Sequence, residues 1–152
     1  MVSHILLAGD CDPTISVGGI LPAIGGNIRV GNSETFVTEA CEYTNSFLSF
    51  FPKISIILNM DADHLDFFKD IDDIRHSFRR FAELLPADGT LIINADTPKY
   101  EDIIRDLPCN VITYGLEHDA DYQAADITYD KYGHASFSVL RNGVKVGSYY
   151  LK

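Results

Sequence analysis

The chain has 152 residues, 46% of them hydrophobic and 22% charged, a composition that can bury a core and that excludes a disordered or collagen-like segment. Its 12 basic and 22 acidic side chains give a formal net charge of −10, which argues against a nucleic-acid-binding protein held by phosphate contacts. The length fits a single domain. An anionic phosphate ligand would therefore need local backbone N–H groups, a few basic side chains, or metal ions.

The sequence holds no apolar run approaching the roughly 20 residues that a membrane-spanning helix needs. Residues 1–10 also lack the basic start and the long apolar run of a secretory signal peptide. We therefore expect a cytoplasmic protein with no membrane partner. The cysteines Cys11, Cys41 and Cys109 form neither a CxxC pair nor a zinc spacing, and we expect them to be reduced and buried.

The N-terminal residues predict short elements around a glycine-rich loop. Residues 3–8 are typical of a helix that ends at Gly9, and residues 13–17 of a short strand. Residues 34–40 form a β-branched run that is typical of another strand. Between these two strands, residues 18–31 are rich in glycine and predict a loop that turns or closely approaches a ligand.

The middle of the chain alternates between helical and strand patterns. Residues 54–58 are almost continuously apolar, which is typical of a strand buried on both faces of a parallel sheet. Residues 71–85 have one apolar stripe and acidic side chains in the first turn, which predicts a helix. Further helices are expected over 44–51 and 98–107, and further strands over 90–94 and 110–114. This order predicts an α/β fold, a mostly parallel sheet flanked by helices.

The C-terminal residues change to a β pattern. Asn142-Gly143 between two β runs is a strong hairpin signal. Three strands are expected, over 122–129, 135–140 and 144–151. We therefore expect a small antiparallel β appendage over residues 120–152, attached to an α/β body over residues 1–116.

Two acidic features follow predicted strands. The first is Glu39 with Glu42, and the second is the run Asn59-Met60-Asp61-Ala62-Asp63-His64-Leu65-Asp66. Open α/β sheets bind ligands at the carboxyl ends of their strands, and Mg²⁺ prefers carboxylate oxygens. Because both features end strands of one predicted sheet, we expect them to converge on one cleft. The alternative is that they are solvated acids, with Glu39 and Glu42 capping the next helix and His64 incidental to its loop.

Other polar residues favour structural roles. Neither GxxxxGK[ST] nor GxGxxG occurs, so an autonomous nucleotide site is not expected. Asp96 or Thr97 is expected to cap the helix at 98–107. The arginines of the helix at 71–85 are expected to form a solvated face that pairs with Asp72 and Asp73; they are Arg75, Arg79 and Arg80.

Several of these segments together resemble the central, ATP-binding domain of the Mur ligases. They are Thr38-Glu39-Ala40, the run Asn59 to Asp66, the helix IDDIRHSFRRF and the turn Asn94-Ala95-Asp96, so the resemblance covers essentially the whole chain. It is most specific for the branch that joins L-alanine to UDP-N-acetylmuramate in peptidoglycan synthesis. The resemblance implies an ATP-dependent amide ligase with an acyl-phosphate intermediate and two Mg²⁺ ions at the phosphates.

The resemblance also implies roles for single residues. Glu39 resembles the glutamate that binds the Mg²⁺ between the β- and γ-phosphates, and His64 the histidine that binds the second Mg²⁺ beside the acyl phosphate. Asp63 or Asp66 would orient His64. Asn59 and Asp63 are the expected cofactor-binding residues. The residues expected to face the nucleotide sugar are Gly25, Gly26, Asn27 and Glu42.

Departures from the family pattern refine this interpretation. Later ligases of the family carry a carbamylated lysine where this chain has Phe78, which fits the L-alanine-adding branch. The family's phosphate-binding loop and both flanking domains are not in this sequence, so we expect an incomplete domain, inactive alone, that exposes a sheet edge and self-associates. The alternatives are a related ligase that attaches a whole peptide to the same sugar nucleotide, and a non-catalytic binding or scaffold module.

Overall fold

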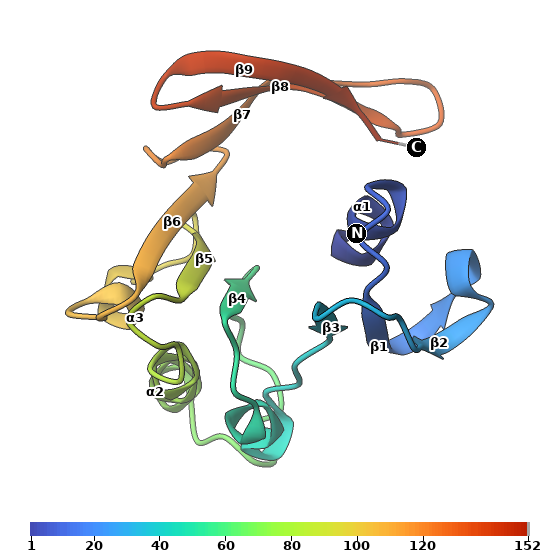
Figure 1. The fold of residues 1–152 in the computed structure, drawn as a ribbon. Coiled ribbons are helices and arrows are strands. Elements are labelled where there is room, and N and C mark those ends of the chain that lie inside the picture. The colour runs from blue at the N-terminus through green and yellow to red at the C-terminus, as the bar shows by residue number, and fades with distance from the viewer. Residues whose placement is uncertain (152) are drawn as a thin grey trace. The chain divides into compact units, whose positions relative to one another are not determined.

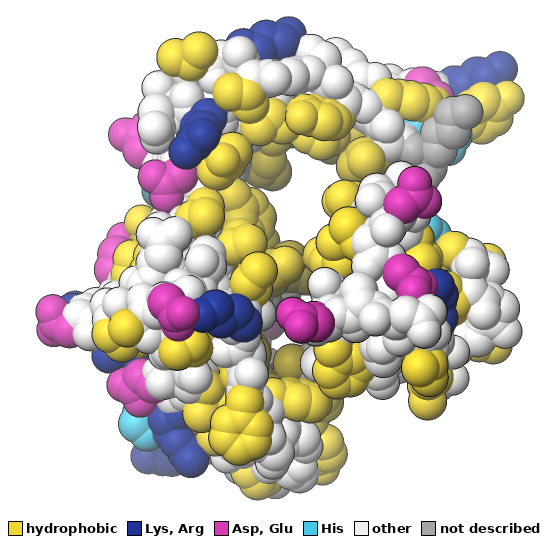
Figure 2. Space-filling model, viewed as in Figure 1, with side chains coloured by type: hydrophobic (Ala, Val, Ile, Leu, Met, Phe, Trp, Pro, Cys, Tyr) yellow, Lys and Arg dark blue, Asp and Glu magenta, His cyan; other side chains and the backbone are white. Residues whose placement is uncertain are grey.

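The computed structural model describes residues 1–151, and the chain divides into two compact units, Met1–Cys41 and Glu42–Lys152. Figure 1 shows their elements in chain order. Charged side chains of both signs are scattered over the visible face of each unit (Figure 2), so the net negative charge is not gathered into one patch there. The expected boundary near residues 116–120 between an α/β body and a β appendage stays a prediction.

The first unit is a short helix followed by a three-stranded sheet. The helix α1 spans Val2–Ala8, and the strands are β1 (Thr14–Leu21), β2 (Gly26–Arg29) and β3 (Phe36–Thr38). The sheet order is β2-β1-β3, with β1 antiparallel to β2 and parallel to β3. Ile15 lies on β1, the central strand of this sheet, and is fully buried.

The predicted glycine-rich loop over 18–31 is wrong, because most of it is a β-hairpin. β1 continues through Gly18 and Gly19 and is joined to β2 by the 3₁₀ turn η1 (Pro22–Ile24). Gly25 ends that turn in the left-handed region, at φ 67°, where glycine pays no Cβ penalty. Glycine has a low strand propensity, so the sequence pattern here does not predict a strand. Pairing between β1 and β2 nevertheless keeps these glycines in a β-hairpin.

The second unit is built on a six-stranded sheet in the order β4-β5-β6-β7-β8-β9 (Figure 1). The strands from β4 to β7 are parallel, and β7, β8 and β9 form an antiparallel meander. This confirms the predicted α/β class with antiparallel C-terminal strands. The bounds are β4 Ile54–Ile57, β5 Thr90–Asn94, β6 Asn110–Gly115, β7 Tyr122–Tyr129, β8 Ala135–Arg141 and β9 Val144–Tyr150.

Three helical elements accompany this sheet, η2 (Tyr43–Ser49), α2 (Ile71–Ala82) and α3 (Glu101–Ile104). Phe47 of η2 stacks on Phe81 of α2 with ring centroids 4.6 Å apart. The helix predicted at 44–51 is a 3₁₀ segment because Thr44 and Asn45 adopt left-handed backbone angles. The helix predicted at 98–107 keeps only one turn.

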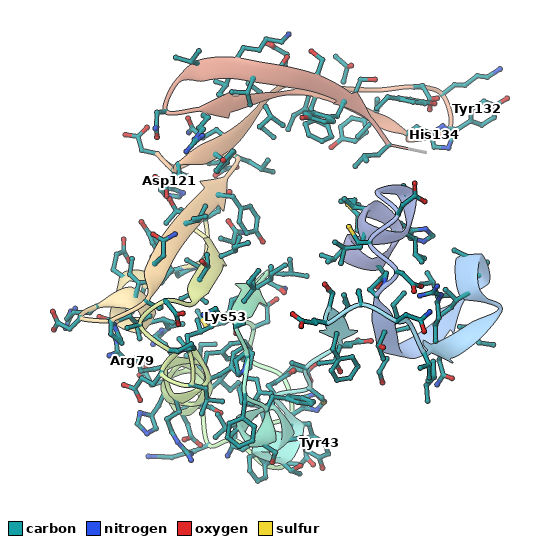
Figure 3. The ribbon with its side chains drawn as sticks, viewed as in Figure 1. Tyr43, Lys53, Arg79, Asp121, Tyr132 and His134 are labelled. Atoms are coloured by element: carbon teal, nitrogen blue, oxygen red, sulfur yellow. The ribbon has the colours of Figure 1, made fainter. Side chains whose placement is uncertain are left out.

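Arg79 joins α2 to the end of α3 (Figure 3). Its guanidinium donates to the main-chain carbonyls of Ile103, at 3.0 Å, and Arg105, and its Nε pairs with Glu83 at 2.8 Å. The predicted pairing with Asp72 or Asp73 is therefore wrong for Arg79, although Arg75 does pair with Asp72. Asp72 and Asp73 lie seven and six residues before Arg79, whereas Glu83 lies four residues after it, at the spacing where side chains of one helix meet.

Asp70 caps the start of α2. Its carboxylate accepts the N–H groups of Asp72 and Asp73, at 3.0 and 2.9 Å. Replacing Asp70 with alanine is expected to lower the free energy of unfolding by about 1 kcal/mol, because two helix N–H groups lose their acceptor. Urea denaturation of the chain measures this change, with Asp70→Asn as the control that keeps a capping oxygen. Equal losses in both variants would contradict the capping role.

β4 lies at one edge of the six-stranded sheet. Ser55 and Ile57 are buried, but Ile54 and Ile56 are 63% and 40% exposed. The prediction of a strand buried on both faces is therefore wrong within this unit, where only one face of β4 is covered. Self-association through an exposed edge stays a prediction.

Among residues 1–151, no helix is long and apolar enough to cross a membrane. The three cysteines are free. Cys109 is buried as expected, but Cys11 and Cys41 are exposed, which corrects the expectation for these two. Both lie outside the regular elements, Cys11 after α1 and Cys41 after β3.

Candidate functional site

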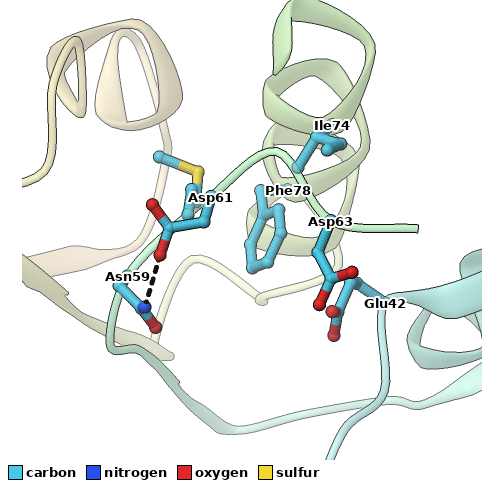
Figure 4. Close-up of a pocket in the computed structure, with 7 residues that line it drawn as sticks. Glu42, Asn59, Asp61, Asp63, Ile74 and Phe78 are labelled. Carbon is cyan, nitrogen blue, oxygen red and sulfur yellow. Dashed lines mark hydrogen bonds between the residues drawn. The ribbon is translucent and has the colours of Figure 1, made fainter. Parts of the chain in front are cut away.

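A polar pocket of about 220 Å³ lies beside the loop that follows β4 (Figure 4). It is lined by Glu42, Asn59, Met60, Asp61, Asp63, Ile74 and Phe78. Three of the predicted site residues, Glu42, Asn59 and Asp63, therefore meet here, beside the face of α2 that carries Ile74 and Phe78, whereas Glu39 and His64 do not line this pocket. Phe78 lines the pocket from α2.

Neighbouring strands fix the start of this loop. The carbonyl of Leu58 accepts the Asn94 side-chain amide at 3.1 Å and the Tyr114 hydroxyl at 3.4 Å. Within the loop, the Asn59 amide donates to Asp61 Oδ2 at 3.1 Å (Figure 4). The residues that follow β4 are therefore held from β5 and β6.

His64 has a left-handed backbone, with φ 52°. Its main-chain N–H donates to Asp63 Oδ1 at 2.7 Å, and its carbonyl accepts the N–H groups of Phe67 and Phe68 at 2.9 Å. Its Nε2 lies 3.6 Å from Glu42 Oε1, whereas its Nδ1 lies 4.0 Å from Asp63 Oδ1. Asp63 therefore orders the backbone of His64 and is too far from the imidazole for a hydrogen bond.

Tyr43 is a site residue that the sequence reasoning missed. Its ring stacks on the imidazole of His64, with centroids 4.6 Å apart, and its hydroxyl donates to Asp66 Oδ2 at 2.7 Å. This hydrogen bond raises the pKa of Tyr43 and lowers the pKa of Asp66. Asp66 therefore contacts Tyr43, not His64 directly.

Glu39 belongs to the first unit and follows β3. Its Oε2 accepts the main-chain N–H of Gly18 at 2.7 Å, and its own N–H donates to the Ser16 carbonyl at 3.0 Å. A Cβ at position 18 would lie 3.1 Å from that carboxylate oxygen, so glycine permits the contact. The Gly18 N–H of β1 thus fixes the orientation of the Glu39 carboxylate.

The expectation that both acidic features end strands of one sheet is wrong. β3 belongs to the three-stranded sheet of the first unit, and β4 to the six-stranded sheet of the second. β3 has only three residues, and the partner it finds is β1, close by in sequence. Convergence of Glu39 and His64 on one cleft stays a prediction.

The residues expected to face the nucleotide sugar lie in different places. Gly25, Gly26 and Asn27 form the tip of the β1–β2 hairpin, where a Cβ on either glycine would meet open space. Glu42 instead lines the pocket with Asp63. Sugar binding by these residues stays a prediction.

The donor set fits an ion that is only partly held by protein. Within residues 1–151, no three His, Cys, Asp or Glu side chains are placed to hold a metal together. Mg²⁺ usually keeps several waters and takes one or two carboxylates plus substrate phosphates. The Glu39 carboxylate fits a Mg²⁺ ion of this kind as a single protein ligand. The His64 imidazole, with the Glu42 carboxylate beside it, fits a second such ion. At either position most of the coordination shell would be left to phosphate and water.

A second pocket, of about 520 Å³, lies at the ends of β5 and β6 around Asp96 and His118. The Asp96 carboxylate accepts the main-chain N–H groups of Leu116, Glu117 and His118 at 2.6, 3.1 and 2.9 Å, and contacts His118 Nδ1 at 2.9 Å. The predicted helix cap is wrong, because α3 has no side-chain cap. Asp96 instead fixes the loop after β6.

These bonds make Asp96 a source of pH-dependent stability. The N–H of Leu116, followed by His118, lowers the pKa of Asp96 from 3.8 to about 2. The stabilisation is therefore complete above about pH 4 and is lost as the pH falls through about 2. Asp96→Asn is expected to lower the unfolding free energy at pH 7, and this difference is expected to shrink between pH 4 and pH 2. Denaturant unfolding at several pH values measures it; a constant difference would contradict the account.

Residues 21–148 match the family described as the Mur ligase middle domain. The chain belongs to the Mur ligase middle-domain family. The predicted resemblance is thereby confirmed. In sequence, this Mur ligase domain is 62% identical over 146 residues to a UDP-N-acetylmuramate--L-alanine ligase of Lachnospira eligens, covering 95% of the chain and 32% of the relative. It is 58% identical to the protein of that name from Agathobacter rectalis, covering 94% of the chain and 31% of the relative.

The Mur ligase domain thus spans about a third of the length of the curated relatives it matches. Among solved structures, UDP-N-acetylmuramate-alanine ligase MurC from Thermotoga maritima matches with a TM-score of 0.80 at 23% identity, over 99% of this chain and 33% of that chain. A Neisseria ligase titled UDP-N-acetylmuramate:L-alanyl-gamma-D-glutamyl-meso-diaminopimelate ligase matches with a TM-score of 0.81 at 24% identity, over 97% and 49%. These structures confirm the fold.

Proposed function

We propose that this chain is the middle segment of an ATP-dependent ligase that joins L-alanine to UDP-N-acetylmuramate in peptidoglycan synthesis. The observation that carries the proposal is the 62% identity over 95% of the chain to a relative of that name. The loop after the parallel strand β4 supports it, because Asp61 and Asp63 of this loop line a polar pocket with Glu42. His64 does not line the pocket, but its Nε2 lies 3.6 Å from Glu42 Oε1.

The proposed reaction has two displacements. The carboxylate of UDP-N-acetylmuramate attacks the γ-phosphorus of ATP, and ADP leaves. The amine of L-alanine then attacks the acyl phosphate, and phosphate leaves. Mg²⁺ ions, when bound, would supply charge neutralisation at the phosphate oxygens. In this proposal Glu39 and His64 each provide one ligand, the Gly18 N–H orients Glu39, and Asn59 and Asp63 order the loop beside the nucleotide.

A chimeric ligase tests this function. In it, this chain replaces the matching 146-residue segment of the Lachnospira eligens ligase, which supplies the remaining two thirds of the protein. We expect the chimera to form the L-alanine amide of UDP-N-acetylmuramate and to release phosphate only when ATP, L-alanine and the sugar nucleotide are all present. Product formation is followed by mass spectrometry.

Whether the full-length protein uses L-alanine or a whole peptide separates the two ligase alternatives. Because the relative supplies the remaining domains, the chimera tests the chemistry of this segment and not its native acceptor. A folded chimera without ligase activity would contradict the proposed function and would favour a binding module. A full-length parent that ligates a whole peptide in place of L-alanine would support the alternative of a related ligase that attaches a whole peptide to the same sugar nucleotide.

The proposal includes a cytoplasmic location, where ATP is available. It also keeps self-association through the edge strand β4, whose Ile54 side chain is 63% exposed. Free sheet edges pair readily with another chain. Sedimentation equilibrium of the chain tests this part.

A further inference from the structure

We propose that Tyr43 is the positioning residue for His64, and that it acts through the stack of its ring on the imidazole. In this arrangement the tyrosine ring holds the imidazole with Nε2 toward Glu42, ready for a divalent cation. The inference rests on the proposed function, because that function makes His64 a cation ligand.

Apart from the ring of Tyr43, few contacts hold the imidazole of His64 in place. Its side chain is 34% exposed, and within residues 1–151 neither ring nitrogen has a hydrogen-bond partner. The nearest carboxylate oxygens are those of Glu42 at 3.6 Å and Asp63 at 4.0 Å. Histidine ligands usually donate their second ring N–H to an acceptor that fixes the ring. Here the stacked ring of Tyr43, at 4.6 Å and 29°, is the contact that can fix it.

Tyr43, labelled in Figure 3, has two further contacts that hold its side chain. Its hydroxyl donates to Asp66 at 2.7 Å, and its ring meets the edge of Phe67 with centroids 6.0 Å apart. Asp66 and Phe67 lie on the loop that carries His64, whereas Tyr43 begins η2. Tyr43 therefore contacts this loop at three residues, His64, Asp66 and Phe67.

Two substitutions separate the ring from the hydroxyl. Tyr43→Leu removes the stack, and Tyr43→Phe keeps the ring but removes the bond to Asp66. Tyr132→Leu is the matched control, because Tyr132 is 71% exposed and its ring lies beside another histidine, His134, at 5.8 Å. Thermal unfolding establishes that each variant is folded.

The first readout is the order of the His64 side chain in the 152-residue chain, measured by NMR relaxation and χ1 couplings with ¹³C-labelled histidine. We expect one ordered rotamer in the wild type, in Tyr43→Phe and in Tyr132→Leu, and rotamer averaging in Tyr43→Leu. Averaging already in the wild type, or unchanged order in Tyr43→Leu, would overturn the proposal. This readout needs neither metal nor activity.

The second readout is the Mg²⁺ concentration for half-maximal activity of the chimeric ligase. Tyr43→Leu is expected to raise it by about 10-fold, the usual scale for losing the support of a metal ligand, and Tyr43→Phe to keep it near the wild-type value. An unchanged Mg²⁺ dependence in Tyr43→Leu, with His64 disordered, would overturn the link to the cation. An inactive wild-type chimera would contradict the proposed function instead, and the NMR result would still decide the positioning role.

Discussion

Replacing His64 with alanine in the chimeric ligase is expected to lower kcat by about 100-fold or more, the cost of removing one group that stabilises charge in a transition state. The imidazole is the side chain that the resemblance assigns to the Mg²⁺ beside the acyl phosphate, and it faces Glu42 across 3.6 Å. Steady-state kinetics at saturating and at limiting Mg²⁺ measure the effect. Near-normal turnover at limiting Mg²⁺ would contradict the assignment.

Two controls keep this result interpretable. His64→Asn removes the imidazole with a residue that tolerates the left-handed backbone at this position, where φ is 52°. His76→Ala removes an exposed imidazole from α2, outside the pocket, and is expected to keep wild-type kinetics. Loss of activity in His64→Ala but not in His64→Asn would indicate backbone strain in place of a lost ligand.

Replacing Glu39 with glutamine is expected to lower kcat of the chimeric ligase by a similar factor of about 100. Glutamine keeps an oxygen that can accept the Gly18 N–H, at 2.7 Å in the wild type, so the geometry of β1 and β3 is preserved. What it removes is the negative charge that a Mg²⁺ ion prefers. The expected signature is a lower kcat with an unchanged unfolding midpoint.

The matched control for Glu39 is Glu34→Gln, an exposed acid of the same unit that precedes β3. It changes the net charge equally and is expected to leave kcat unchanged. If both variants lost activity alike, the effect would come from net charge. A Glu39→Gln chimera that kept wild-type kcat at limiting Mg²⁺ would remove Glu39 from the proposed mechanism.

The elements that the sequence predicted well have strong local signals. The helix at 71–82 has an uninterrupted apolar stripe and an aspartate cap, and the β8–β9 hairpin has Asn142-Gly143 at its turn. Strands β5 and β6 are short apolar runs between turn residues. In each case local propensity and tertiary packing favour the same conformation, so the prediction succeeds.

The elements that it missed lack a clear signal in their own residues. The glycines of the β1–β2 hairpin have low strand propensity, so the hairpin was not predicted. The helical pattern at 44–51 is interrupted because Thr44 and Asn45 adopt left-handed backbone angles, which helix propensity does not predict. Asp96 lies where a helix cap is expected, but it binds a loop twenty residues later. No local pattern contains such a contact.

The same division holds in the candidate site. The run from Asn59 to Asp66 was identifiable because acids and a histidine follow an apolar strand. Tyr43 was not, since its role arises from a stack across 21 residues of sequence. The only available signal was its place directly after Glu42, in a segment already marked by two acids.

Pulsed electron paramagnetic resonance of the chimeric ligase with Mn²⁺ in place of Mg²⁺ tests the central claim most directly. The sample contains ATP and UDP-N-acetylmuramate without L-alanine, and its histidines carry ¹⁵N. We expect a ¹⁵N coupling from an imidazole bound to Mn²⁺ that disappears in His64→Asn and persists in His76→Ala. A spectrum without that coupling, or one unchanged in His64→Asn, would contradict that claim.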